Sequence, residues 1–180
     1  MPVSEKTFRQ LALEDPGQWE LHHGVLSRKP NMTAEHNNVA TALLLQLGPQ
    51  LDKNRYRLRL NLGHVRRSVD SYYIPDVYVI PIEQLRTQLG TRKLEVYAEP
   101  LPLVVEVWSA STGEYDVDSK LPEYQQRGDL EIWRIHPYER TLTTWRRLSD
   151  GNYEQSQYQG GNIRPLALPG VVVDLDTLFD

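Results

Sequence analysis

Two short apolar runs near the middle of the chain constrain its fold more than any other feature. Residues 74–80 and 103–108 are β-branched or aromatic at nearly every position, which is typical of strands that are covered on both faces of a sheet. Each run carries one carboxylate where the pattern calls for an apolar residue, Asp76 in the first and Glu106 in the second. The sequence therefore predicts two buried strands of one central sheet, each with an acid in its interior.

The two acids suggest a specific kind of chemistry. A buried carboxylate is costly unless a cation or a hydrogen-bond donor compensates it. Two carboxylates on neighbouring strands would also repel each other, and a divalent cation shared between them would relieve that repulsion. Lys120 opens a helical pattern soon after the second run and can bring an ammonium group to the same place. Two acids and a lysine around a divalent cation suit the hydrolysis of a phosphodiester.

Each of these residues also has an ordinary structural interpretation. Asp76 follows a proline and can act as a turn acid at the start of its strand, and Glu106 can pair with Lys120 or with an arginine. A single acid in an apolar strand is more often part of an ion pair than a metal ligand. The combination of two such acids with a following lysine favours a functional site.

Length and composition bound the remaining possibilities. With 180 residues the chain is expected to form one domain, 1–180. It contains no cysteine, which excludes disulfides, thiolate metal sites and cysteine nucleophiles. We expect a soluble cytoplasmic protein with no membrane partner, because no run approaches about 20 apolar residues and the N-terminus has no apolar segment. The net charge of −4 argues against general coating of nucleic acid and still allows a local basic surface.

One segment is basic throughout. Between Lys53 and Arg67 every charged residue is a lysine or an arginine, and Arg55, Arg57 and Arg59 alternate with apolar or aromatic positions. A strand here would present these guanidinium groups on one side. The row can be the solvated edge of a sheet, where charges discourage aggregation, or a nucleic-acid-binding surface that contacts phosphates. The sequence leaves both interpretations open.

Periodicity and turn signals predict the other elements. They predict helices, β-hairpins and further strands, as follows: helices over 4–15, 33–47, 82–89 and 119–127, with a helical turn at 174–179; hairpins over 19–29 and 141–158; and strands over 130–136 and 166–173. His23-Gly24 and Asp150-Gly151 are the turn signals of the two hairpins.

In this order the elements and their motifs resemble the restriction-endonuclease-like PD-(D/E)-x-K superfamily. The chain looks most like a bacterial family of nucleases that was long described as a domain of unknown function. The matching pieces are Trp19-Glu-Leu-x-x-Gly24, Thr33-Ala-Glu-His36, Ile74-Pro-Asp-Val77, Leu103-Val-Val-Glu-Val107, Asp116-x-x-x-Lys120 and Glu131-x-Trp133. The resemblance implies an α/β (α+β) fold, with a central mixed sheet flanked by helices and with added N- and C-terminal hairpins.

The resemblance also implies roles for individual residues. Asp76 and Glu106 would be metal ligands, together with the backbone carbonyl of Val107, and Lys120 would take the lysine role. The parent pattern places that lysine two residues after the acid, where this chain has Trp108. Glu20 on the first hairpin, or Glu35 and His36 at the start of the next helix, would be additional members of the site.

These roles imply an Mg²⁺- or Mn²⁺-dependent endonuclease that acts on DNA, with a homodimer as one way to cut both strands. Two alternatives stay open. The first is a catalytically inactive module of the same fold that binds nucleic acid or a protein. The second is a hydrolase of another phosphodiester or of a phosphoanhydride, because a fold does not determine a substrate.

Overall fold

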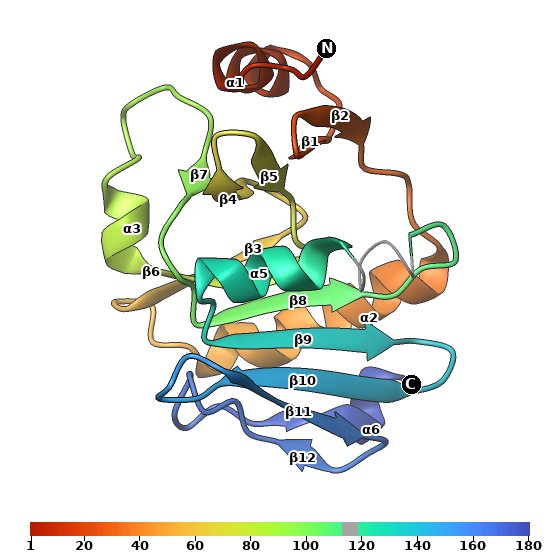
Figure 1. Ribbon diagram of the computed structural model, residues 1–180. Helices are drawn as coiled ribbons and strands as arrows, with labels where there is room; N and C mark the ends of the chain where they lie inside the picture. Colours follow the sequence, from red (N-terminus) through yellow and green to blue (C-terminus); the bar gives the residue numbers. More distant parts are fainter. Residues whose placement is uncertain (113–118) are drawn as a thin grey trace.

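The computed structural model describes residues 1–112 and 119–180. Its centre is a six-stranded sheet in the order β11-β10-β9-β8-β6-β3 (Figure 1). Among the described residues, β8 and β9 pair in parallel, and every other pair of neighbours in this sheet is antiparallel. The strands are β3 (Tyr56–Leu60), β6 (Val77–Pro81), β8 (Leu103–Val107), β9 (Glu131–His136), β10 (Thr141–Arg147) and β11 (Tyr153–Tyr158). The predicted central mixed sheet is confirmed.

A second, five-stranded sheet lies beside the first, in the order β2-β1-β5-β4-β7. Its strands are β1 (Trp19–His22), β2 (Val25–Arg28), β4 (His64–Ser68), β5 (Ser71–Tyr73) and β7 (Val96–Tyr97). The predicted N-terminal hairpin is β1–β2, and its turn residues His23 and Gly24 both have positive φ, 48° and 80°. Such angles match a two-residue turn whose twist suits the flanking strands. None of the other three strands, β4, β5 and β7, was predicted from the sequence.

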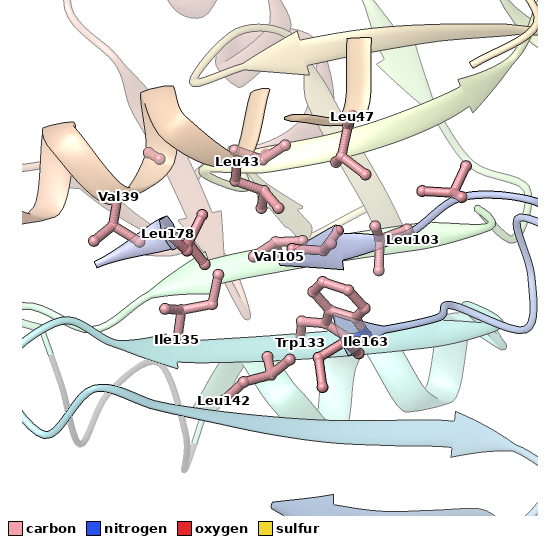
Figure 2. Close-up of a cluster of buried hydrophobic side chains, with 14 of the residues drawn as sticks. Val39, Leu43, Leu47, Leu103, Val105, Trp133, Ile135, Leu142, Ile163 and Leu178 are labelled. Atoms are coloured by element: carbon pink, nitrogen blue, oxygen red, sulfur yellow. The ribbon is translucent and has the colours of Figure 1, made fainter. Parts of the chain in front are cut away.

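Helices cover both faces of the central sheet (Figure 1). On one face α2 (Ala34–Leu47), continued by the 3₁₀ turn η1 (Gly48–Gln50), packs together with α6 (Leu175–Leu178). Val39, Leu43 and Leu47 lie on the buried side of α2 and face residues of β8 and β9, including Val105 and Trp133 (Figure 2). The helix predicted over 33–47 is therefore present, and these apolar residues form its core face.

The opposite face is covered by α5 (Leu121–Arg127), with α3 (Ile82–Arg86) packed near the end of β6. Pro122 lies in the first turn of α5, where the N–H that proline lacks would have no partner inside the helix. The helix ends at Gly128, which adopts the left-handed conformation. The predicted helix over 119–127 thus agrees with the structure to within its first residues.

The N-terminal helix α1 (Glu5–Glu14) packs on the second sheet. Ser4 caps it by accepting a hydrogen bond from the backbone N–H of Thr7. Phe8 is fully buried against Leu21 of β1 and Tyr72 of β5. This small cluster fixes the hairpin β1–β2, which contributes residues to the site described below.

One predicted element is wrong. The strand expected over 166–173 is mostly a series of turns, and only Val173 belongs to a strand, β13 (Val173–Asp174), which pairs with β12 (Asn162–Ile163). Leu168 donates its N–H to the carbonyl of Pro165, and Val171 donates to that of Leu168. The apolar side chains that suggested a strand are instead anchors, because Leu168 and Val171 are buried in the core beneath α2.

Candidate active site

The two acids predicted from the apolar runs lie at the same end of neighbouring strands. β6 and β8 are antiparallel, and Val77 lies opposite Val105. One step further along this register, Asp76, which immediately precedes β6, lies opposite Glu106 of β8. The carboxylate Oδ2 of Asp76 accepts a hydrogen bond from the N–H of Val107 at 2.7 Å. This contact continues the strand pairing through a side chain. Both acids are buried and both line a cavity of about 470 Å³.

Asp76 is surrounded by donors. Besides the N–H of Val107, Lys29 Nζ lies 2.8 Å from its Oδ1, and His36 Nε2 lies 3.0 Å from its Oδ2. Burial raises the pKa of Asp76, but the neighbouring Lys29 and His36 outweigh burial and hold the pKa well below its usual range. Asp76 is therefore a carboxylate at neutral pH.

Sequence reasoning gave Lys29 no role. It is the residue after β2, and its ammonium group also donates to Asn61 Oδ1 at 2.6 Å and to the carbonyl of Ile74 at 2.7 Å. In the sequence it is a lysine between an arginine and a proline at the end of a hairpin, where an exposed side chain is expected. The one available signal was the buried Asp76 itself, which requires a cation from elsewhere in the chain.

The second half of the site joins the two sheets. Lys120 Nζ lies 3.0 Å from Oε1 of Glu20 on β1 and 3.4 Å from Oε1 of Glu106 on β8. The hydroxyl of Tyr124, one helical turn after Lys120, donates to Glu106 Oε1 at 2.5 Å. Glu20 Oε1 also accepts the N–H of Ile74 at 2.8 Å. Lys120 and Glu20 thus meet although 100 positions separate them in the sequence.

The structure brings together some of the predicted residues and leaves others outside. Asp76, Glu106, Lys120 and Glu20 line one cavity, and His36 contacts Asp76 from the α2 side. Glu35 is exposed at the start of α2, where it accepts a hydrogen bond from the hydroxyl of Tyr138, and it is not among the residues that line the cavity. Asp116, which belongs to the motif ending at Lys120, lies outside the described residues.

Arg57 and Arg59 of the basic row lie on β3, the edge strand of the central sheet, and Arg55 lies in the turn immediately before it. Arg55 is exposed, with its guanidinium 5.3 Å from the ring centre of Tyr56. Arg57 donates to the carbonyl of Tyr56, and Arg59 Nε lies 2.8 Å from Oε1 of Glu95. Glu95, which is distant in the sequence, therefore pairs with Arg59 of the basic row. None of the three lines the cavity, as far as the described residues define it.

Comparison with known proteins decides the family. A family model described as "Uma2: Putative restriction endonuclease" matches residues 6–176. The chain belongs to the Uma2 family. A crystal structure of a "putative nuclease belonging to DUF820" from Anabaena variabilis ATCC 29413 has the same fold, with a TM-score of 0.76, 17% sequence identity, and coverage of 99% of this chain and 98% of that chain. A comparison with curated proteins finds no match. The predicted family resemblance is confirmed.

The donor chemistry of this Uma2 site fits a hard divalent cation. Asp76 and Glu106 supply carboxylate oxygens, the ligands that Mg²⁺ prefers, and Mg²⁺ commonly uses one or two carboxylates and fills its other positions with water. The N–H of Val107 points at Asp76, and its carbonyl faces the same edge because both groups of a strand residue point the same way. Within residues 1–112 and 119–180, no group of three or more His, Asp or Glu side chains forms a complete metal cluster.

The described part of the chain holds no helix that has both the length and the apolar character needed to cross a membrane.

Proposed function

We propose that this Uma2-family protein is a divalent-metal-dependent endonuclease that hydrolyses phosphodiester bonds of DNA. One observation carries the proposal: Asp76, Glu106, Lys120 and Glu20 come from separate segments and both sheets, and all of them line one cavity. Burying several charged side chains together costs desolvation free energy, so such clusters are uncommon unless other interactions or a function compensate for that cost. The family description "Putative restriction endonuclease" and the fold shared with the DUF820 protein support the same function.

Asp76 and Glu106, with the carbonyl of Val107, would hold Mg²⁺ or Mn²⁺. The ion supplies Lewis acidity, which makes water a better nucleophile at neutral pH and offsets negative charge on the phosphate. The chain's own contribution is to hold the ligands still. The N–H of Val107 fixes one carboxylate and the hydroxyl of Tyr124 fixes the other. Such preorganisation reduces the rearrangement that the reaction would otherwise require.

Lys120 is the residue best placed to act on the phosphate or on the attacking water. Its ammonium group has three donors and no acceptor, and contacts with Glu20 and Glu106 orient it toward the cavity that both acids line. In that position it would donate to a phosphate oxygen or orient the water, and its charge would stabilise the negative charge that grows on the phosphate. Glu20 serves as the positioning residue for Lys120.

The test is nicking of supercoiled plasmid, and cleavage of short DNA and RNA oligonucleotides, in the presence of Mn²⁺ or Mg²⁺. We expect wild-type protein to cut DNA, and Glu106→Gln to lose at least about 100-fold in rate. Glu131→Gln is the matched control, because Glu131 is also a buried strand glutamate but is bonded to Trp133 and Arg146 outside the cavity. Equal loss in both variants, or no cutting by any of them, would contradict the proposal.

A specific observation also favours the non-enzymatic alternative. Each buried acid of the site has a lysine as neighbour: Lys29 for Asp76, and Lys120 for both Glu20 and Glu106. Ion pairs of this kind occur in proteins that have no catalytic activity. A module that only binds DNA would retain DNA in a filter-binding assay, would cut none, and would show no rise in melting temperature when Mn²⁺ is added.

A further inference from the structure

Lys29 is held in place far more firmly than an ordinary surface lysine. Its side chain is 3% exposed, and its ammonium group donates to three acceptors at 2.6, 2.7 and 2.8 Å. The acceptors are Asn61 Oδ1, the carbonyl of Ile74 and Asp76 Oδ1. Three donors and three acceptors match one for one. A lysine fixed in this way holds its ammonium group beside Asp76, among the residues that line the cavity.

That charge lies where a divalent ion would approach Asp76. Among the described residues, Oδ2 of Asp76 accepts hydrogen bonds from two donors, His36 and Val107, whereas Oδ1 accepts one, from Lys29 at 2.8 Å. A divalent ion therefore meets fewer competing donors at Oδ1. Mg²⁺ binds carboxylate oxygen at about 2.0–2.1 Å. An ion on Oδ1 would therefore lie within about 5 Å of the ammonium group, and like charges at that separation repel strongly in a buried site.

We propose that Lys29 competes with the divalent ion for Asp76 and thereby weakens ion binding. This inference rests on the proposed function, since it concerns the same ion. When an ion arrives, the ammonium group can lengthen its contact with Oδ1 while Asn61 and the Ile74 carbonyl still accept two of its three hydrogen bonds. Lys29 also lines the cavity, which gives it space to move. The site is thus held together by Lys29 without the ion and by the ion when it is bound.

The experiment is isothermal titration of Mn²⁺ into the full-length protein at fixed pH and ionic strength, with the Mn²⁺-induced rise in melting temperature as a second readout. Lys29→Met removes the charge and keeps an unbranched side chain. Lys29→Gln removes the charge and keeps an N–H donor in the side chain, and it tests the inference if the methionine variant fails to fold. Lys53→Met is the matched control, because Lys53 is an exposed lysine.

We expect both Lys29 variants to bind Mn²⁺ at least tenfold more tightly than wild type, and Lys53→Met to bind as wild type does. If wild type binds Mn²⁺ and the Lys29 variants bind it equally or more weakly, the inference is overturned and the proposed function stands. If only the Lys29 variants bind, the inference is supported, and an ion-activated wild-type enzyme is excluded. If none of the proteins binds, both are overturned.

Discussion

His64 is buried between aromatic rings, with the ring of Phe8 edge-on at 5.6 Å and that of Tyr72 at 6.5 Å. Its Nε2 lies 2.8 Å from the carbonyl of Trp19, and its Nδ1 has no hydrogen-bond partner among residues 1–112 and 119–180. Burial lowers the pKa of His64, and the hydrogen bond to the carbonyl of Trp19 only partly opposes this effect. The neutral ring is therefore the form that the folded protein accepts.

This predicts a loss of stability in mild acid. Above pH of about 6.5 the ring is neutral in both the folded and the unfolded chain. Below that pH the unfolded chain takes up a proton that the folded chain resists, so the free energy of unfolding falls by up to about 1.4 kcal/mol per pH unit for this one group. His64→Gln should remove that part of the slope in urea unfolding between pH 7 and pH 5.

A control separates His64 from the other titrating histidine of the same sheet. Burial also lowers the pKa of His22, which is less enclosed than His64. His22→Gln should therefore leave most of the acid-induced loss in place. An identical pH dependence for His64→Gln and wild type would refute the assignment.

At the scale of single residues, the sequence identifies a site residue when its side chain conflicts with its local pattern. Asp76 and Glu106 could be predicted because they are acids in apolar runs, and their burial is observed. Lys29 fits the polar sequence pattern of its neighbours, so nothing local marks it. Its burial depends on contacts with Asp76 and Asn61, which lie 47 and 32 positions away in the sequence. Glu35 shows the opposite case. Its position at a helix start satisfies a local rule, and the structure leaves it exposed.

At the scale of elements, β3 combines an edge position with a basic outer face. Tyr56, Leu58 and Leu60 pack against the core beneath α2, so the intervening arginines lie on the other side of the strand. Arg55 precedes the start of β3, and Asn61 follows its other end. Asn61 donates its N–H to the carbonyl of Asp76. DNA bound at the cavity would have to follow the strand for roughly 20 Å to meet Arg55.

If that path is used, Arg55→Ser with Arg57→Ser should weaken DNA binding and reduce the slope of log K against log salt by up to about 1.8, because each lost phosphate contact contributes about 0.9. Arg92→Ser with Lys93→Ser removes the same charge from an exposed loop and serves as the control. Equal slopes for both double variants, measured by fluorescence anisotropy, would assign the row to solvent. Arg59 is left unchanged because it pairs with Glu95.

The elements that the sequence predicted correctly carry their own local signals. Helix α2 has an N-cap, an acid in its first turn and a long apolar stripe, and the hairpin β1–β2 has a two-residue turn. The short strand β7 has only two paired residues, which align in parallel with His64 and Val65. A two-residue strand is recognised by its hydrogen bonds to the neighbouring strand, so the local sequence pattern does not predict it. The strand predicted over 166–173 is wrong because Leu168 and Val171 are apolar for packing in the core, and the backbone around them forms turns.

At the scale of the whole molecule, the central sheet is stabilised by one hydrophobic core on each face. Leu43 is fully buried in the core beneath α2, and Leu45 on the same helix is 68% exposed. Leu43→Ala should lower the free energy of unfolding by about 2–5 kcal/mol, whereas Leu45→Ala should change it by at most about 0.5 kcal/mol. Chemical denaturation followed by tryptophan fluorescence measures both, and similar costs at the two positions would contradict the assignment of the buried face.

The hairpin β1–β2 contributes two kinds of residue to the cavity: some pair with the buried charged side chains, and others only line the wall. Near the open end of the hairpin, Glu20 contacts Lys120 and Lys29 contacts Asp76. Val25, Ser27 and Arg28, which lie between them in the chain, also line the cavity. Exchanging these three residues, of which Arg28 is charged, would alter the shape, charge and polarity of the cavity wall without changing Asp76 or Glu106. Under the proposed function, preference for one substrate over another could therefore evolve, or be engineered, separately from the residues proposed to act in catalysis.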